Sequence, residues 1–379
     1  MLGVAACWCA FAMPARVAAQ GPAAASAPPT ASSAAPPVPR WLAVPRARGR
    51  LTAAQLGVVI NTADPYSVEV GEYYVKQRDI PAAHVLRVEL PVQPRLDEAE
   101  LARLKQAIDG RFDESVQALA LAWTQPYAVA CQSINAVLAL GLDPQLCSRT
   151  CDRASTSPYF NSASREPFKD HGLRPSMLLA ARSPAQAKAL IDRGVASDHT
   201  LGLRGAPPVQ VWYLRTSDAA RSVRWPLFPP AGPVPQKALD IQVERQDGVP
   251  AGRRVVLMQT GQAQLKGLDR IDWVPGALAD HLTSFGGLLE RTEGQTTALA
   301  WLEAGATASY GTVSEPCNHP QKFPHPQLLL LHYVQGSTAL EAYWKSVAWP
   351  QQGVFVGEPL AAPFAAAPPP VTAATKTLP

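Results

Sequence analysis

The chain has 379 residues, of which 47% are hydrophobic and 17% are charged, and its formal net charge is +4. This composition excludes an intrinsically disordered protein, and the length allows one large domain or two smaller ones. The charge is small, and no basic run is interleaved with aromatic residues, which argues against a nucleic-acid-binding protein.

The N-terminal end has the pattern of an export signal. Residues 1–20 contain an apolar run, residues 2–13, followed by small residues, which predicts a secretory signal peptide. The run is far shorter than the roughly 20 apolar residues that cross a bilayer, so we expect no transmembrane segment after cleavage. A disordered cytosolic leader is the alternative. We expect a protein exported to the periplasm or the extracellular space.

Segments rich in Ala, Pro and Ser flank the part of the chain that is expected to fold. Residues 21–40 cannot bury enough apolar surface to offset the entropy of ordering, and they predict a disordered spacer. Residues 365–379 have the same composition and predict a disordered tail. The folded α/β body is therefore expected at residues 41–364, either as one unit or as two subdomains, 41–220 and 221–364.

The first part of the body alternates between short apolar runs and amphipathic stretches. Strands are predicted at residues 56–60, 84–90 and 118–123, where short apolar runs end in polar turns. Helices are predicted between them, at residues 67–77 and 97–112, because apolar side chains recur there at helical spacing. This alternation is typical of a parallel sheet with right-handed crossovers.

Residues 131–174 are expected to be rich in loops, and cysteines are expected to hold them in place. After removal of the leader, the remaining cysteines are Cys131, Cys147, Cys151 and Cys317. An even number of cysteines in an exported chain predicts two disulfides, with three alternative pairings. In each pairing, Cys317 joins distant parts of the chain. A metal site that adds His319 to three of these cysteines is the alternative, but the spacing matches no common zinc pattern and no metal is expected.

The remainder of the body continues the same pattern. The predicted strands are residues 177–181, 209–214, 255–258 and 306–313, and the predicted helices are residues 184–193, 276–284, 296–304, 326–334 and 339–346. The whole pattern predicts an α/β protein with a mostly parallel sheet flanked by helices, together with a loop-rich insertion pinned by disulfides.

Polar residues follow several of the predicted strands. In an open parallel sheet the ligand site lies beyond the carboxyl ends of the strands, so strands that all run the same way would gather these residues along one edge. Each residue taken alone is also explained as a turn residue or a helix cap. No cofactor is expected. The candidate ligand-binding residues are Asn61, Asp64, Ser67, Thr124, Gln125, Thr216, Asp218, Thr260 and Thr312.

A second candidate site contains His281 and Ser284. On the helix predicted at residues 276–284 these two side chains share a face, so the imidazole can act as a general base for the hydroxyl. A histidine satisfied by a backbone carbonyl is the alternative. Glu315 and Cys317 form a further candidate, although a disulfide at Cys317 removes the nucleophilic thiol. The candidate catalytic residues are His281, Ser284 and Glu315.

Several segments of the chain resemble a family of exported bacterial proteins that is associated with genomes encoding exosortase-type protein sorting. The matching segments are VVINTADPYS (58–67), WTQPY (123–127), SPYF (157–160), RPSM (174–177), ADHLTSFGG (279–287) and GATASYGTV (305–313). They extend over most of residues 56–364. The resemblance implies export and brings no activity with it.

The order of the predicted strands and the closing segment, residues 356–359, are similar to those of gingipain-type cysteine peptidases, which have a caspase-like sheet. Those enzymes place a His-Gly pair after one strand and a cysteine after the next. The corresponding positions here hold Thr260-Gly261 and Asp280-His281. The resemblance therefore implies a caspase-like fold that lacks the catalytic dyad.

Three functions are compatible with these observations. The leading interpretation is a non-peptidase, caspase-like binding or assembly factor of the cell envelope, with envelope proteins or a small ligand as partners. The first alternative is a peptidase-like or esterase-like hydrolase that uses His281 with Ser284 or Cys317. The second is a small-ligand receptor whose pocket is formed by the polar strand ends.

Overall fold

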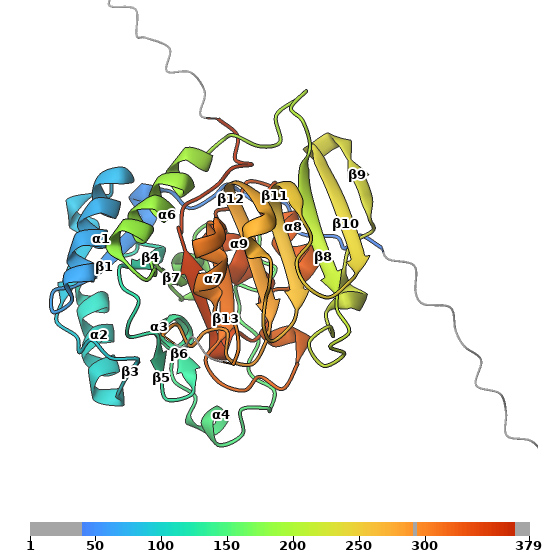
Figure 1. Cartoon of the computed structure of the whole chain (residues 1–379). Helices are drawn as coiled ribbons and strands as arrows, with labels where there is room; N and C mark the ends of the chain where they lie inside the picture. The colour runs from blue at the N-terminus through green and yellow to red at the C-terminus, as the bar shows by residue number, and fades with distance from the viewer. Residues whose placement is uncertain (1–39, 291–293, 368–379) are drawn as a thin grey trace, which may run out of the picture. The chain divides into compact units, whose positions relative to one another are not determined.

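A long mixed sheet runs through the centre of the protein (Figure 1). The structure is a computed structural model, and it describes residues 40–290 and 294–367. The predicted signal peptide and most of the predicted spacer and tail lie outside these residues. Every described residue belongs to one compact unit of the chain.

Within the described residues, the sheet has eleven strands in the order β2-β1-β4-β7-β14-β13-β12-β11-β8-β10-β9, and a second sheet has three, in the order β3-β5-β6. The strands of the large sheet are β1 (Leu56–Asn61), β2 (Val85–Val88), β4 (Ala118–Leu121), β7 (Ser176–Leu178), β8 (Val209–Arg215), β9 (Gly232–Val234), β10 (Leu239–Arg245), β11 (Gly252–Gly261), β12 (Ile271–Leu282), β13 (Ala308–Thr312) and β14 (Gly353–Gly357). Those of the small sheet are β3 (Arg95–Leu96), β5 (Ala128–Val129) and β6 (Gln132–Ser133).

The direction of the large sheet reverses between β13 and β14. These two strands pair antiparallel, whereas β14 pairs parallel with β7. As a result, β2, β1, β4, β7 and β14 run one way, and β13, β12, β11, β8 and β10 run the other way. The predicted α/β class with a mostly parallel sheet is confirmed. The expectation that all polar strand ends share one edge is wrong, because the carboxyl ends of β1 and β4 lie at the edge opposite to those of β8, β11, β12 and β13.

Helices flank the sheet on both faces (Figure 1). One face packs against α1 (Pro65–Gln77), α8 (Pro326–Val334) and α9 (Ala339–Ser346), and the other against α2 (Glu98–Arg111), α3 (Ile134–Leu140) and α7 (Ala298–Ala304). The remaining helices are α4 (Pro144–Ser148), α5 (Pro167–His171) and α6 (Pro184–Ser197). Val58 and Ile60 of β1 face the first group and Val59 faces the second, which is the two-residue period of a strand that is covered on both faces.

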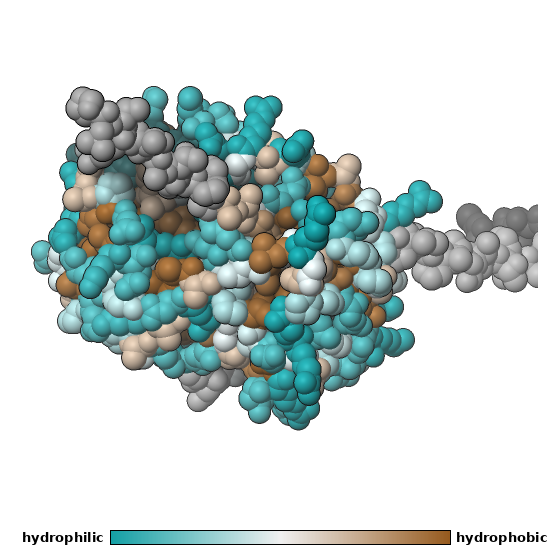
Figure 2. All heavy atoms as spheres, turned by 90° about the horizontal axis from the view of Figure 1, so that it is seen from above, coloured by the Kyte–Doolittle hydropathy of each residue, from teal (hydrophilic) through white to brown (hydrophobic). Residues whose placement is uncertain are grey.

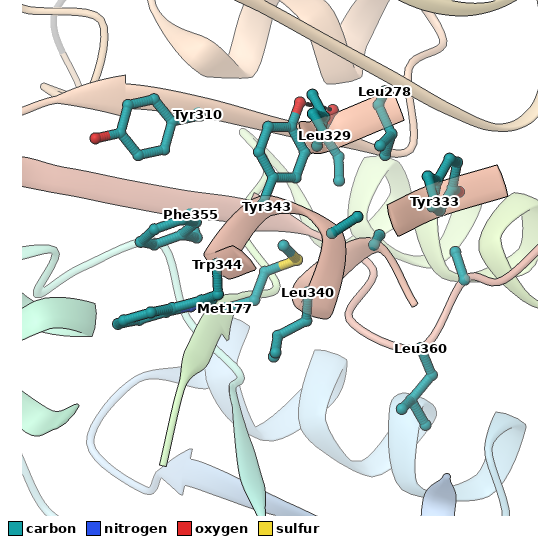
Figure 3. Packing of buried hydrophobic residues seen from close by; sticks show 14 of the residues in the cluster. Met177, Leu278, Tyr310, Leu329, Tyr333, Leu340, Tyr343, Trp344, Phe355 and Leu360 are labelled. Atoms are coloured by element: carbon teal, nitrogen blue, oxygen red, sulfur yellow. Dashed lines mark hydrogen bonds between the residues drawn. The ribbon is translucent and has the colours of Figure 1, made fainter. Parts of the chain in front are cut away.

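Aromatic packing holds β14 at the point of reversal (Figure 3). Trp344 of α9 stacks on Phe355 of β14 with the ring centroids 4.6 Å apart, and Tyr310 of β13 meets the same ring at 5.1 Å. The indole N–H of Trp344 donates to the carbonyl oxygen of Ser176 in β7 at 2.9 Å. Aromatic pairs of this kind contribute about 0.5–1.5 kcal/mol beyond their buried area. One helix thus fixes β14 between β7 and β13.

Most predicted elements are confirmed. The helices predicted at residues 326–334 and 339–346 are found with the same bounds as α8 and α9. The strand predicted at residues 209–214 is found as β8, and the helix predicted at residues 184–193 is found as the longer α6. These segments carry clear start and stop signals, with a proline at the first turn of α6 and of α8.

One predicted helix is a strand. The segment 276–284, predicted as a helix, is mostly part of β12, near the middle of the sheet. Residues 276–282 are all buried, so this strand lacks the polar alternation that distinguishes a strand from a buried helix. The helix α3 lies in the stretch expected to be rich in loops, and β10 has no predicted counterpart.

Both predicted disulfides form. Cys131 pairs with Cys147 and Cys151 pairs with Cys317, with Cα–Cα distances of 5.3 Å and 5.0 Å. Because all cysteines of the described residues are oxidised, the alternative of a cysteine metal site is not realised there. Residues 40–290 and 294–367 also contain no group of three or more His, Cys, Asp or Glu side chains placed to hold a metal ion.

Figure 2 shows hydrophilic side chains over most of the visible face, with apolar side chains in patches between them. None of the helices that the structure describes has the length and apolar character that spanning a membrane requires.

Candidate functional site

Thr260 and His281 lie side by side in the large sheet. They are register partners in the parallel pair of β11 and β12. The two positions at which the resemblance expects a peptidase dyad are therefore neighbours, and neither of them carries a cysteine. Cys317, the cysteine of the alternative hydrolase, is in a disulfide with Cys151 and has no free thiol.

His281 has no ring nitrogen available for catalysis. Its side chain is fully buried, its Nε2 lies 3.0 Å from the carbonyl oxygen of Thr296, and its Nδ1 lies 3.0 Å from the indole nitrogen of Trp301. An indole N–H only donates and a carbonyl only accepts, so the imidazole is neutral with its proton on Nε2. Burial lowers the pKa of His281 to about 3. This arrangement leaves no lone pair that can accept the proton of Ser284.

Asp280 forms a buried ion pair on the opposite face of β12. Its carboxylate accepts from Arg224 at 2.6 Å and from the side-chain amide of Gln259 at 2.7 Å. Arg224 also donates to the carbonyl oxygens of Thr260 at 2.9 Å and Pro324 at 3.1 Å. Burial raises the pKa of Asp280, and the charge of Arg224 opposes this shift. These groups join β11, β12 and the loop before α8, and none is free to act on a substrate.

The loop after β8 covers the end of β11. The hydroxyl of Thr216 donates to the carbonyl oxygen of Gly261 at 2.5 Å, and Ser222 Oγ accepts from the backbone N–H of Thr216 at 2.9 Å. A Cβ atom at Gly261 would overlap the carbonyl oxygen of Arg221. The carboxyl end of β11 is therefore closed at this point by packed backbone.

The other candidates at this edge have structural partners. Asp218 pairs with Arg221 at 2.8 Å and also accepts from its backbone N–H, as a cap does. Thr312 donates to the carbonyl oxygen of Ser284 at 2.9 Å. Glu315 accepts from the backbone N–H of Cys317 at 2.8 Å. These residues stabilise turns at the carboxyl ends of β8, β12 and β13.

Asn61 and Ser67 stabilise the end of β1. Both are fully buried. The Asn61 side chain accepts from the backbone N–H of Leu90 at 2.9 Å and donates to the carbonyl oxygen of Leu90 at 3.0 Å. The hydroxyl of Ser67 accepts from the backbone N–H of Asn61 at 2.8 Å. Their hydrogen bonds tie β1 to the segment after β2 and to α1.

Asp64, Thr124 and Gln125 do lie together. They line an open pocket with a volume of about 380 Å³ at the carboxyl ends of β1 and β4, which we term the β1/β4 pocket. Its other lining residues are Tyr66, Val92, Ala181, Arg182, Leu289, Glu290 and Leu299. Two larger pockets, of about 570 Å³ and 960 Å³, contain no residue of the predicted site.

The β1/β4 pocket carries two carboxylates with free oxygens. One Asp64 oxygen caps α1 by accepting from the backbone N–H of Tyr66 at 3.0 Å, and one Glu290 oxygen accepts from the hydroxyl of Tyr127 at 2.5 Å. Burial raises the pKa of Tyr127, so this hydroxyl keeps its proton. Among the described residues, the second oxygen of each carboxylate has no hydrogen-bond donor. Arg182 is ion-paired with a glutamate of α7, which leaves the pocket negative.

Two charged residues of this pocket, Arg182 and Glu290, were not among the predicted ligand-binding residues. Arg182 directly follows the predicted strand at residues 177–181, so the rule that selected Asp64 and Thr124 also applies to it. Glu290 lies beyond β12, whose carboxyl end is at the opposite edge, and it reaches the pocket by the connection to α7. No local sequence pattern indicates that Glu290 lies in this pocket.

Neither the family models nor the curated protein sequences compared with the chain gave a match. Among solved structures, the Arg-specific cysteine proteinase gingipain R is similar, with 11% identity, a TM-score of 0.38, and coverage of 82% of this chain and 78% of that chain. The complex of the Porphyromonas gingivalis RgpB pro- and mature domains has 10% identity and a TM-score of 0.38, and the match covers 81% of this chain and 79% of that chain. A structure described as a protease has 11% identity and a TM-score of 0.41, and the match covers 84% of this chain and 80% of that chain. TM-scores below 0.5 assign neither a family nor an activity to this chain.

Proposed function

We propose that the protein is an exported, non-peptidase binding or assembly factor of the cell envelope, and that the β1/β4 pocket holds its ligand. One contrast carries this proposal. At the strand ends expected to hold a peptidase dyad, His281 and Asp280 are buried and bonded to structural partners and Thr260 is buried, whereas the β1/β4 pocket is open and contains carboxylate oxygens without a hydrogen-bond donor among the described residues. Its volume is in the range of known ligand pockets, roughly 300–1,000 Å³.

The two disulfides support the export part of the proposal. Disulfides persist in oxidising compartments such as the periplasm and the extracellular space, and they are rare in the cytosol. Cys151–Cys317 joins residues 166 positions apart, so it links distant parts of the body. The apolar run at residues 2–13 supports export independently.

The pocket's charge defines the ligand chemistry. Asp64 and Glu290 each present one carboxylate oxygen that has no donor among residues 40–290 and 294–367, and the positive charge of Arg182 is compensated by its own ion pair. Val92, Leu289 and their apolar neighbours provide a surface for a hydrocarbon chain. The ligand group is therefore an alkyl ammonium or guanidinium, presented by a small molecule or by an envelope protein.

Calorimetric titration with hexylamine tests this function. We expect the disulfide-bonded chain to bind hexylamine, and we expect Asp64→Asn and Glu290→Gln each to weaken binding by about tenfold because each removes a charged hydrogen bond. Glu98→Gln, at an exposed position on the first turn of α2, is the matched control and should not change the affinity.

Two results would count against the proposal. The first is no binding of hexylamine, or binding that neither pocket variant weakens. The second is turnover of an ester or peptide panel that Ser284→Ala abolishes, since this would restore the hydrolase alternative.

A further inference from the structure

A second, smaller pocket opens beside the β1/β4 pocket. It lies between α6 and α7, and its volume is about 120 Å³. Ala181 and Leu299 line both pockets, so the two share a wall. We term it the α6/α7 pocket, and its other lining residues are Gln186, Ala189, Leu190, Arg193, Leu302 and Glu303.

Arg193 lines the α6/α7 pocket and has no ion-pair partner among the described residues, since the nearby acidic residue of this pocket, Glu303, is paired with Arg182. The Nη2 of Arg193 donates to the carbonyl oxygens of Leu302 at 2.8 Å and Ala306 at 2.7 Å, which caps the end of α7. Its Nε is buried without a hydrogen-bond partner in the described part of the chain. Burial lowers the pKa of Arg193 to about 10, and no acidic group among the described residues opposes this shift.

An unpaired, largely buried cation is unfavourable. Removing a charge from water is costly unless an opposite charge or further hydrogen bonds offset the loss. A carboxylate is the natural partner of a guanidinium, because its two oxygens match the planar N–H groups. The α6/α7 pocket has room for such a group, since a water molecule occupies only about 30 Å³.

An ion pair marks the boundary between the two pockets. Arg182 lines the β1/β4 pocket, Glu303 lines the α6/α7 pocket, and the two side chains are paired with each other. Their charges cancel. The charge that remains is negative at Asp64 and Glu290 and positive at Arg193.

We propose that the two pockets form one bipartite site for an aliphatic zwitterion, a molecule with an ammonium group at one end and a carboxylate at the other. The carboxylate pairs with Arg193, and the ammonium group pairs with Asp64 and Glu290. The apolar wall at Ala181 and Leu299 contacts the hydrocarbon chain between them. This inference rests on the proposed function of the β1/β4 pocket and names its ligand class.

A series of ω-amino acids tests the inference. The probes are γ-aminobutyrate, δ-aminovalerate and ε-aminocaproate, with hexylamine lacking the carboxylate and caproate lacking the amine. We expect at least one zwitterion to bind the disulfide-bonded chain about tenfold more tightly than hexylamine, because only the zwitterion engages both ends of the site. Calorimetry gives each affinity directly.

Variants assign the two ends. Arg193→Gln should abolish the advantage of the zwitterion and leave hexylamine binding unchanged, whereas Asp64→Asn should weaken both ligands. Because Arg193 also caps α7, unchanged hexylamine binding shows that the variant is folded, and Arg193→Lys should restore part of the advantage. Arg87→Gln, which changes an exposed arginine paired with Glu72, is the matched control.

The outcomes separate this inference from the proposed function. The bipartite site is overturned if the zwitterions bind no more tightly than hexylamine, or if they still bind more tightly than hexylamine to the Arg193→Gln variant. In either case the proposed function stands as long as hexylamine binding depends on Asp64. If hexylamine does not bind the wild-type chain, both proposals are overturned. An acetylated peptide that ends in lysine carries an ammonium group and a carboxylate close together. If the free-acid form of this peptide binds more tightly than its C-terminal amide, the end of a polypeptide is identified as the source of the ligand.

Discussion

His281 illustrates how a residue selected for its chemistry can serve the fold. It lies on a strand near the middle of the sheet, where a polar side chain must find internal partners because water is excluded. Trp301 and the carbonyl oxygen of Thr296 supply those partners from α7 and the segment before it. The sequence shows a histidine near a hydroxyl, and only the tertiary structure shows that both ring nitrogens are occupied.

The pH dependence of stability tests this assignment. The pKa of His281 in the folded chain, about 3, lies below its value in the unfolded chain, about 6.5, so the unfolded chain binds more protons between these pH values. The contribution of His281 to the free energy of unfolding is therefore fully present above pH ~6.5 and falls as the pH decreases. Between pH ~7 and ~5, His281 should account for a loss of about 2 kcal/mol in the free energy of unfolding.

His281→Gln removes the titration while keeping one donor and one acceptor. Urea unfolding of both proteins at several pH values should show that the advantage of the wild type shrinks as the pH falls. Burial also lowers the pKa of His325 to about 4 and of His332 to about 3, so the variant retains part of the pH dependence. An equal loss of stability in both proteins would show that the pKa of His281 is the same in the folded and the unfolded chain.

At the scale of elements, a prediction is reliable where the element has a solvated face or clear start and stop signals, and the buried helices α8 and α9 have such signals. Helices α1 and α2 have a buried side and a polar side, so apolar spacing identifies them. The central strand β12 is buried on both faces from Gly276 onward and has no such contrast. The sequence of residues 276–282 is compatible with either a helix or a strand. The pairing with β11 and β13 makes this segment a strand.

The close contact at the end of β11 gives a test at this scale. Gly261→Ala should lower the free energy of unfolding by about 3 kcal/mol, the upper part of the range for overpacking, because its methyl group overlaps the backbone of Arg221. Gly110→Ala, in α2, meets open space and should raise stability by up to about 1 kcal/mol, since alanine favours helices over glycine. Urea unfolding measures both. Full stability in Gly261→Ala would mean that the loop after β8 does not cover β11 tightly.

At the scale of the whole molecule, the β1/β4 pocket depends on contact between the two oppositely directed halves of the sheet. Asp64 and Thr124 follow strands of one half, and Glu290 and Leu299 belong to the connection between β12 and β13 of the other. The hydrogen bond from Tyr127 to Glu290, a lining residue of the pocket, joins the two halves. Changes that loosen either half are therefore expected to act on the ligand site.

Removal of the disulfides tests how the whole chain is held together. In the chain-entropy account, the cost of losing a disulfide grows with the length of the closed loop. Cys151–Cys317 spans 166 residues and Cys131–Cys147 spans 16. Replacing the first pair with serine should lower the free energy of unfolding by about 5 kcal/mol, and replacing the second by about 3 kcal/mol. Equal losses in urea unfolding would contradict this order.

Three of the predicted ligand residues, Asp64, Thr124 and Gln125, lie together because β1 and β4 are adjacent and parallel. Alternating strands and helices in the sequence predict this local arrangement. Asn61 and Ser67 follow the same rule, yet they are buried and bonded to backbone. A position after a strand is predictable, whereas the direction and the partners of its side chain are not.

The sequence by itself determined the α/β class, most helices and strands, and the presence of two disulfides, because these depend on local spacing, composition and an even number of cysteines. The tertiary structure alone decided where the sheet reverses direction, which cysteines pair, and which polar strand ends share a pocket. The antiparallel pairing of β13 with β14 depends on contacts between residues far apart in the chain, such as Trp344 and Ser176, and no local pattern encodes it.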